Sequence, residues 1–254
     1  MQYRLLFVLI LCFVSMHAQA AKPRVLRVAA VQGPPHVTNA ESEQPSGSAP
    51  DFMRKYVFPE LKKKFNMDVV WKSSPFKREQ RDLEMGNIDM LFLVLKTPER
   101  EKIFDYSAEP FLEEQPGVIV AKDFQKGKTS VSVKEFAGKT VGQMAGAVVA
   151  DPFTKQGTKV IFLTGEDIGE RLSNLVETHR IDGVFIHLSS ITEDIVERNK
   201  FVKLKSVQIH DMASYKVWIA YSKKLEPEIK AEIDRLISAN RKHYRASLPM
   251  PSPK

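Results

Sequence analysis

The feature that most constrains the fold is an almost unbroken apolar segment, residues 88–95, set between two signals for the ends of secondary structure. Gly86 suits the C-terminal end of a helix, because glycine readily adopts positive φ. Thr97 can cap a new turn, and Pro98 suits its first position. A strand that is apolar on both faces is typical of a parallel sheet covered by helices on both sides. We therefore predict an α/β fold in which Arg100 follows the carboxyl end of a buried strand.

The chain before this strand alternates between strand and helix. Residues 25–31 and 67–71 read as strands, and residues 52–65 read as a helix that Pro59 must kink or end. A further helix leads to Gly86. This alternation is the pattern of a doubly wound lobe, and such sheets bind ligands at the carboxyl ends of their strands.

The N-terminus reads as a secretory signal over residues 1–20. Arg4 supplies the positive charge, residues 5–15 are apolar, and Ala-Gln-Ala at 18–20 offers a cleavage pattern. An uncleaved membrane anchor is the alternative. Cys12 is the only cysteine and lies inside the signal, so disulfides, cysteine catalysis and thiolate zinc sites are excluded from the mature chain. We expect a periplasmic protein that depends on its core for stability.

The formal net charge of +7 is compatible with an anionic ligand or an anionic membrane surface. The basic run at residues 62–64 has no interleaved aromatic residues and is typical of a solvated helix face, so we expect no nucleic-acid partner. The sequence shows no adjacent nucleophile and base, no metal-ligand spacing and no phosphate-binding loop. We therefore predict no enzyme activity, no metal and no cofactor.

Three motifs around the buried strand carry a resemblance to a known family. Gly86-x-Ile88-Asp89, the turn Thr-Pro-Glu-Arg ending at Arg100, and the phrase Ser107-x-x-Pro110-Phe111 resemble those of the family 3 extracellular solute-binding proteins, in both content and spacing. The best-known members carry polar amino acids to ABC importers. The resemblance implies a type II periplasmic binding protein-like fold, with two lobes that are each a mainly parallel sheet flanked by helices and are joined by two crossover strands.

In that family the arginine of the turn clamps the α-carboxylate of the ligand, which implies the same role for Arg100. The alternative is a surface arginine paired with Glu99 or Glu101. The loop after the first strand keeps the two prolines of the family but has Gly33 and His36 where aromatic residues usually stand. His36 is then either a ligand contact or a solvated loop residue.

The second half departs further from the family pattern. The segment Gly-Lys-Thr-Val-Gly at residues 138–142 resembles the family's second-lobe strand, but Ala147 and Val148 replace the hydroxyl residues that bind the ligand carboxylate. His187 stands where amino-acid binders have the aspartate that grips the ligand ammonium. It is either a cleft residue or a histidine satisfied at a strand end. A buried ammonium without a carboxylate would cost several kcal/mol, so a standard α-amino acid is a poor ligand for this chain.

The predicted division of the chain is a signal peptide at 1–20, a first lobe at 21–114 together with 213–254, and a second lobe at 115–212. Residues 202–212 are expected to form the return crossing. We also expect Thr164 to cap a helix in the second lobe, and Ser190 with Glu193 to form a capping box.

The residues expected to contact the ligand come from both lobes and lie in the predicted cleft. They are Arg100, Gln32, His36, Phe76, Arg78, Leu95, Thr97, Gln143, Gly146, Ala147 and His187.

The function predicted from these residues is periplasmic binding of a small polar or anionic organic solute, amino-acid-like in kind, by a monomer whose lobes close on it. Arg100 and backbone N–H groups near Gly146 would hold the solute, and an ABC importer would receive it. The alternative is a ligand-sensing or accessory protein that acts with a membrane sensor or without any importer.

Overall fold

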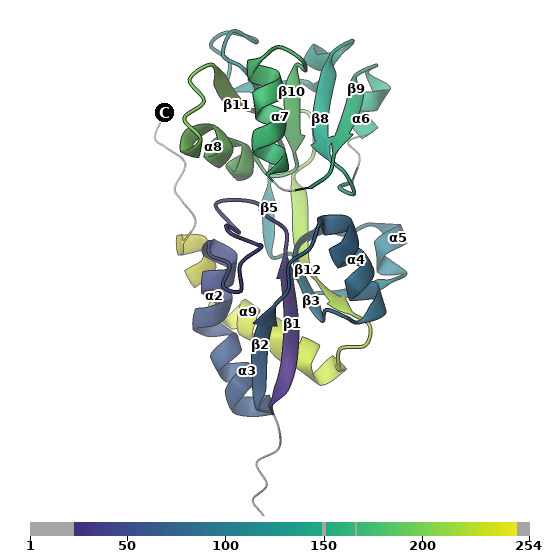
Figure 1. Cartoon of the computed structure of the whole chain (residues 1–254), viewed down its shortest axis with the longest axis vertical. Helices are drawn as coiled ribbons and strands as arrows, with labels where there is room; N and C mark the ends of the chain where they lie inside the picture. The colour runs from purple at the N-terminus through teal and green to yellow at the C-terminus, as the bar shows by residue number, and fades with distance from the viewer. Residues whose placement is uncertain (1–22, 149–150, 166, 248–254) are drawn as a thin grey trace, which may run out of the picture.

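The computed structural model describes residues 23–148, 151–165 and 167–247, and it contains two β-sheets joined by strands that run between them (Figure 1). The first sheet has the order β2-β1-β3-β12-β4, with β5 also paired to β12. Strand β1 is parallel to β2 and β3, whereas β12 is antiparallel to β3, β4 and β5. The bounds of these strands are β1 Arg24–Ala30, β2 Met67–Trp71, β3 Met90–Leu95, β4 Phe104–Tyr106, β5 Leu112–Glu114 and β12 Tyr215–Ser222.

The second sheet has the order β7-β11-β6-β10-β8-β9. Its β8 is parallel to β9 and β10, and β6 is antiparallel to both of its neighbours. We call the part built on the first sheet lobe 1 and the part built on the second lobe 2. The bounds are β6 Gly117–Ala121, β7 Ser130–Val131, β8 Thr140–Met144, β9 Lys159–Leu163, β10 Gly183–Ile186 and β11 Leu204–Ile209.

The two-lobed α/β fold predicted from the sequence is confirmed. The chain changes sheet between β5 and β6 and again between β11 and β12, and the lobe limits that we propose, 114–115 and 212–213, fall in these two gaps. The expectation that residues 202–212 form the return crossing is wrong for most of that segment. Strand β11 lies within the lobe 2 sheet, where it pairs with β6, and its Val207 and Ile209 are buried in the lobe 2 core.

Helices cover the sheet of lobe 1 on both sides (Figure 1). The helix expected over residues 52–65 is interrupted near Pro59, as predicted: α2 ends at Tyr56, and Pro59 lies in the first turn of a second helix, α3. The helix that leads to the buried strand ends at Gly86, which has a φ of 74°. The bounds are α2 Ser48–Tyr56, α3 Phe58–Phe65, α4 Phe76–Met85, α5 Pro98–Glu101 and α9 Pro227–Ser247.

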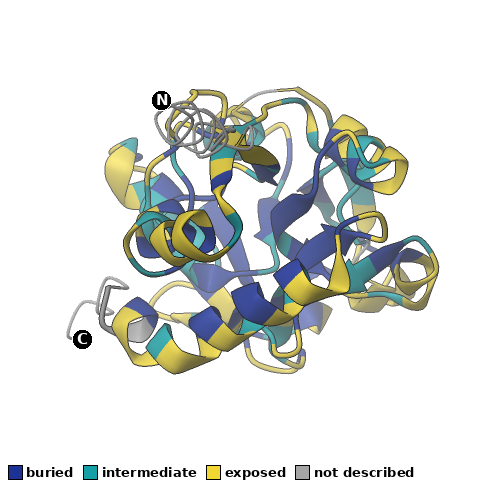
Figure 2. Ribbon diagram, turned by 90° about the horizontal axis from the view of Figure 1, so that it is seen from below, coloured by how far each residue is buried: buried dark blue, intermediate teal, exposed yellow. Residues whose placement is uncertain are grey.

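The long helix α9 packs against lobe 1 with one apolar face, and the opposite face is exposed (Figure 2). Each large aliphatic side chain buried in this way stabilises the fold by roughly 1.5–3 kcal/mol. The buried residues of that face include Ile229, Ile233, Leu236 and Ile237.

The helical segments of lobe 2 are η1 Val133–Phe136, α6 Asp151–Lys155, α7 Ile168–Glu177 and α8 Ser189–Arg198. Two predicted caps in this lobe are wrong. Helix α7 begins only at Ile168, so Thr164 lies too far upstream to cap it. The backbone carbonyl of Thr164 instead accepts a hydrogen bond from the Arg171 side chain. Helix α8 has no side-chain cap of its own, because a carboxylate from β5 takes that role.

The predicted signal peptide lies outside the described residues. None of the helices in the described part of the chain is long and apolar enough to cross a membrane.

Candidate functional site

The turn that carries Arg100 forms as its sequence predicts. The Thr97 hydroxyl accepts a hydrogen bond from the backbone N–H of Arg100 at 3.3 Å, and Pro98 occupies the first turn of α5. The turn directly follows β3. Because β3 is buried and fixed in the sheet, Arg100 is held at the end of lobe 1 that faces lobe 2.

The Arg100 side chain is 8% exposed and reaches across to lobe 2. Its Nη1 donates to the carbonyl of Leu95 at 2.8 Å, and its Nη2 donates to the carbonyl of Gly146 at 2.9 Å. The guanidinium also lies 5.5 Å from the centre of the Phe76 ring. Burial lowers the pKa of Arg100, although an arginine keeps its charge at physiological pH. The alternative of a surface arginine is wrong.

Gly146 provides the lobe 2 side of this contact, which we call the Arg100 contact. Its φ is 88°, and a Cβ there would lie 2.8 Å from Cγ of Lys77 in α4, so glycine suits both the turn and the close approach of the lobes. The carbonyl faces Arg100, whereas N–H groups were expected here. The neighbouring N–H groups of Ala145 and Ala147 donate to the carbonyls of Leu163 and Met144.

Two further predicted residues meet beside Gly146. His187 donates from Nε2 to the carbonyl of Val148 at 3.0 Å, and Gln143 donates to the same carbonyl at 2.5 Å. Burial lowers the pKa of His187 to about 4, the Val148 bond opposes that shift, and the Arg100 charge adds to it. His187 is therefore neutral at pH 7. The Oε1 atom of Gln143 is buried without a protein partner.

Other predicted site residues lie apart from the Arg100 contact. Gln32 is exposed, and its Oε1 accepts from the N–H of Ala40 at 2.9 Å. The Arg78 side chain is 75% exposed and faces Asp82 at 3.8 Å along the surface of α4. Neither residue contacts Arg100 in this structure. Of the remaining predicted residues, Thr97 caps the turn that carries Arg100, and the Leu95 carbonyl accepts a hydrogen bond from the Arg100 side chain. Ala147 is half-buried beside Gly146.

His36 is fully buried, so the expectation of a solvated loop residue is wrong. Its Nε2 lies 2.8 Å from the Ser190 hydroxyl and 3.5 Å from Glu114, and its Nδ1 lies 3.1 Å from the Tyr244 hydroxyl and 3.4 Å from that of Ser48. We call these five residues the His36 cluster. It does bring a serine next to a histidine, which the sequence did not indicate.

An apolar contact between the lobes also escaped sequence reasoning. Leu93 has a φ of 60°, and the pairing of β3 with β12 shifts register beside it. Such bulges re-aim side chains and often lie near functional sites. Ile191 of α8 packs here, because a Cβ on Gly33 would lie 2.9 Å from Cδ1 of Ile191 and 3.5 Å from Cδ1 of Leu93. The missing aromatic at position 33 therefore leaves room for Ile191.

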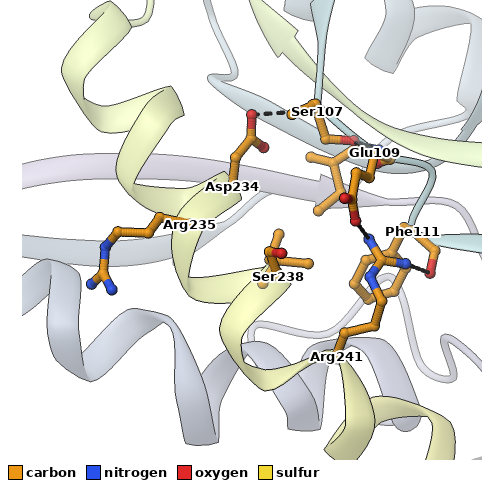
Figure 3. Close-up of a pocket in the computed structure, with 10 residues that line it drawn as sticks. Ser107, Glu109, Phe111, Asp234, Arg235, Ser238 and Arg241 are labelled. Atoms are coloured by element: carbon orange, nitrogen blue, oxygen red, sulfur yellow. Dashed lines mark hydrogen bonds and ion pairs between the residues drawn. The ribbon is translucent and has the colours of Figure 1, made fainter.

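Two surface hollows of the described chain lie away from the Arg100 contact. One of about 230 Å³ lies beside α9, where Arg241 pairs with Glu109 at 3.2 Å and Asp234 accepts from the N–H of Ala108 at 3.0 Å (Figure 3). Its polar groups mostly serve to hold the segment between β4 and β5. A second, open hollow of about 480 Å³ lies at the rim between Pro75 and the start of α7. The described residues offer no group of three or more side chains suited to hold a metal ion.

Solved structures of several binding proteins share this fold. An arginine-binding protein from T. maritima, in mutant form, superposes with a TM-score of 0.70 at 20% identity, covering 87% of this chain and 92% of that one. An amino acid ABC transporter substrate-binding protein from Streptococcus pneumoniae, bound to L-arginine, gives 0.70 at 19% identity, with 89% and 97% covered. An ancestral arginine-binding protein bound to glutamine gives 0.68 at 22% identity, with 87% and 95% covered.

The family of the chain follows from its sequence. No curated protein matches it significantly. The model of the bacterial extracellular solute-binding proteins, family 3, matches residues 26–246, which is most of the chain. Members of this family bind solutes and are not enzymes. The serine beside the histidine in the His36 cluster does not indicate an active site, because the imidazole is enclosed by protein partners. The chain belongs to family 3 of the bacterial extracellular solute-binding proteins.

Proposed function

We propose that this protein binds a small organic anion, a carboxylate above all, in the cleft between its lobes, and that it delivers this solute in the periplasm to an ABC importer. The observation that carries the proposal is the state of Arg100. A buried guanidinium normally has a carboxylate partner, because an unpaired buried charge is costly. Here its hydrogen-bond partners are two neutral carbonyl oxygens, so the site has a positive charge to offer.

The geometry supports an exchange of partners at Arg100. The Leu95 carbonyl belongs to lobe 1, so its bond to Nη1 persists when the lobes separate. The Gly146 carbonyl belongs to lobe 2 and withdraws on opening, which frees Nη2. A ligand carboxylate then takes its place, and the charge-assisted bond that forms is about twice as strong as one to a neutral acceptor. Closure of lobe 2 over the ligand completes the complex.

The opposing face of lobe 2 favours a ligand without an ammonium group. His187 is neutral, and its Nε2 donor already bonds to Val148. Ala147 and Val148 supply no hydroxyl oxygens. Leu93 and Ile191, which both lie against Gly33, supply a wall suited to hydrocarbon. These features support a carboxylate with an apolar or weakly polar body.

A thermal-shift screen tests the proposal. Organic acids, hydroxy acids and amino acids would be added to the purified mature protein, because a ligand of the native state raises the melting temperature by mass action. We expect the largest shifts from monocarboxylates and dicarboxylates without an amino group, followed by calorimetry on the best of them. A tight complex with a cationic amino acid would refute the proposed ligand class.

A further inference from the structure

The His36 cluster joins both lobes and the strand between them. His36 and Ser48 belong to the segment that follows β1 and to α2, and Tyr244 belongs to α9, so these three lie in lobe 1. Glu114 is the last residue of β5, where the chain leaves lobe 1. Ser190 lies in the first turn of α8 in lobe 2. The cluster is therefore a point at which movement of one lobe relative to the other must change contacts.

Lobe 1 fixes the orientation of the imidazole. Nδ1 faces the hydroxyl of Tyr244 at 3.1 Å and that of Ser48 at 3.4 Å, and the Tyr244 side chain is 2% exposed. Nε2 therefore points toward lobe 2, where the Ser190 hydroxyl lies 2.8 Å away. The ring is a rigid lobe 1 group aimed at a lobe 2 partner.

Glu114 ties the start of α8 to the same point. Its Oε2 accepts from the backbone N–H of Ser190 at 3.1 Å, and the carbonyl of the next residue, Gln115, accepts from the N–H of Ser189 at 2.9 Å. Burial raises the pKa of Glu114, but hydrogen bonds from His36 and Ser190 outweigh burial and bring it below the ordinary value. The carboxylate is charged and lies at a helix N-terminus, where negative charge is stabilising.

We propose that His36 acts as a closure latch, a lobe 1 group whose bond to Ser190 holds lobe 2 against lobe 1 before any ligand has bound. The bond to Ser190 crosses the lobes, whereas the bonds to Tyr244 and Ser48 stay within lobe 1. His36 therefore positions the lobes and makes no contact with the proposed solute.

The latch changes the affinity for any solute. The bond to Ser190 is also expected in the ligand-bound closed form, so the latch favours that form over the open protein that first admits the solute. Loss of the latch is therefore expected to lower the apparent affinity. The latch differs from the Arg100 contact in one respect. A ligand carboxylate competes with Gly146 for Arg100, but the partners of His36 are all protein groups.

Distance measurements on the ligand-free protein test the latch. Spin labels would be placed on cysteines at the exposed positions Lys63 in lobe 1 and Lys126 in lobe 2, in the predicted mature chain, which has no cysteine of its own. Ser190→Ala removes the bond across the lobes, and Ser173→Ala, the matched control, removes a buried serine hydroxyl bond inside α7 of lobe 2. Loss of one hydrogen bond predicts a rise of about fivefold in the ratio of open to closed protein for Ser190→Ala.

Ser173→Ala is expected to leave the distance distribution of the wild type unchanged. An unchanged distribution in Ser190→Ala, or equal opening in the two variants, would overturn the proposal. Circular dichroism melting of both variants ensures that folded proteins are compared. Because no ligand is present, the result does not depend on the solute class proposed above.

Discussion

Two polar contacts between the lobes, both among the described residues, differ in kind. In the Arg100 contact a buried cation donates a hydrogen bond to a neutral carbonyl. A charged acceptor, such as a ligand carboxylate, can replace that carbonyl. The His36 cluster sets a buried ring against hydroxyl groups and a carboxylate that all belong to the protein. The difference indicates that recognition of the solute and closure of the lobes depend on separate residues. Each prediction below changes one side of this comparison.

Removal of the Arg100 charge should have the largest effect. Arg100→Met keeps much of the side-chain bulk but removes the guanidinium that we propose binds the ligand carboxylate. Loss of one member of a buried charged pair costs about 3 kcal/mol of binding free energy. We expect the affinity for the best carboxylate to fall at least a hundredfold in calorimetry. Arg78→Met, at an exposed arginine, is the control and should bind as the wild type does. Equal losses in the two variants would show that Arg100 has no special role in recognition.

A titration on the Arg100 side comes next in size. The pKa of His187 is about 4 in the folded protein, against an ordinary value near 6.5, so between these values only the unfolded chain binds this proton. Stability therefore falls as the pH drops through this range, by about 2 kcal/mol between pH 7 and pH 5. Urea denaturation of His187→Gln at both pH values should show a smaller drop than the wild type.

The control for that experiment is His179→Asn. His179 is exposed and has a φ of 54°, which asparagine tolerates. This variant should keep the pH dependence of the wild type. The same drop in His187→Gln as in the wild type would mean that His187 is accessible to protons in the folded state.

A smaller effect is predicted for Leu93, which lies at the apolar contact between the lobes. Leucine at a φ of 60° is strained by about 1–2 kcal/mol, a cost that glycine avoids. Leu93→Gly should therefore be more stable than Leu93→Ala by about 1 kcal/mol in urea denaturation. At the neighbouring Val94, which has no positive φ, alanine should be the more stable of the two. The usual preference for alanine at both positions would show that the bulge carries no strain.

The smallest effect is expected from the charge in the His36 cluster. Glu114→Gln keeps the shape of the side chain but removes the negative charge at the start of α8, which is worth about 0.3–1 kcal/mol. The pKa of Glu114 is lowered, so its contribution is complete above the ordinary pKa and is lost as the pH falls through the lowered one. The variant should be less stable at pH 7, and its difference from the wild type should shrink as the pH falls below the ordinary carboxyl range. A difference that does not change with pH would point to shape and not charge.

Local signals in the sequence were sufficient for the frame of the site. Gly86, Thr97 and Pro98 mark their turns through backbone preferences that neighbours do not override, so the place of Arg100 at the end of β3 was predictable. The alternation of strands and helices likewise predicted the strands and helices of lobe 1 up to β3. These features depend on residues close together in the chain.

The contacts between the lobes depend on distant residues and were not predictable. His36 and Tyr244 are 208 positions apart, and His36 and Ser190 are 154 apart, so no local pattern relates them. The capping box expected at Ser190 failed for the same reason, because a distant carboxylate caps α8. The turn at Gly146 presents its carbonyl to the other lobe, and only the relative position of the two lobes decides which backbone group faces Arg100.

A crystal structure of the protein with the tightest carboxylate from the screen tests the central claim most directly. We predict that the carboxylate bonds to Nη2 of Arg100 in the place of the Gly146 carbonyl, while the Leu95 carbonyl keeps its bond to Nη1 and His36 keeps its bond to Ser190. A ligand in the hollow beside α9, or one between the lobes whose carboxylate does not touch Arg100, would contradict the account.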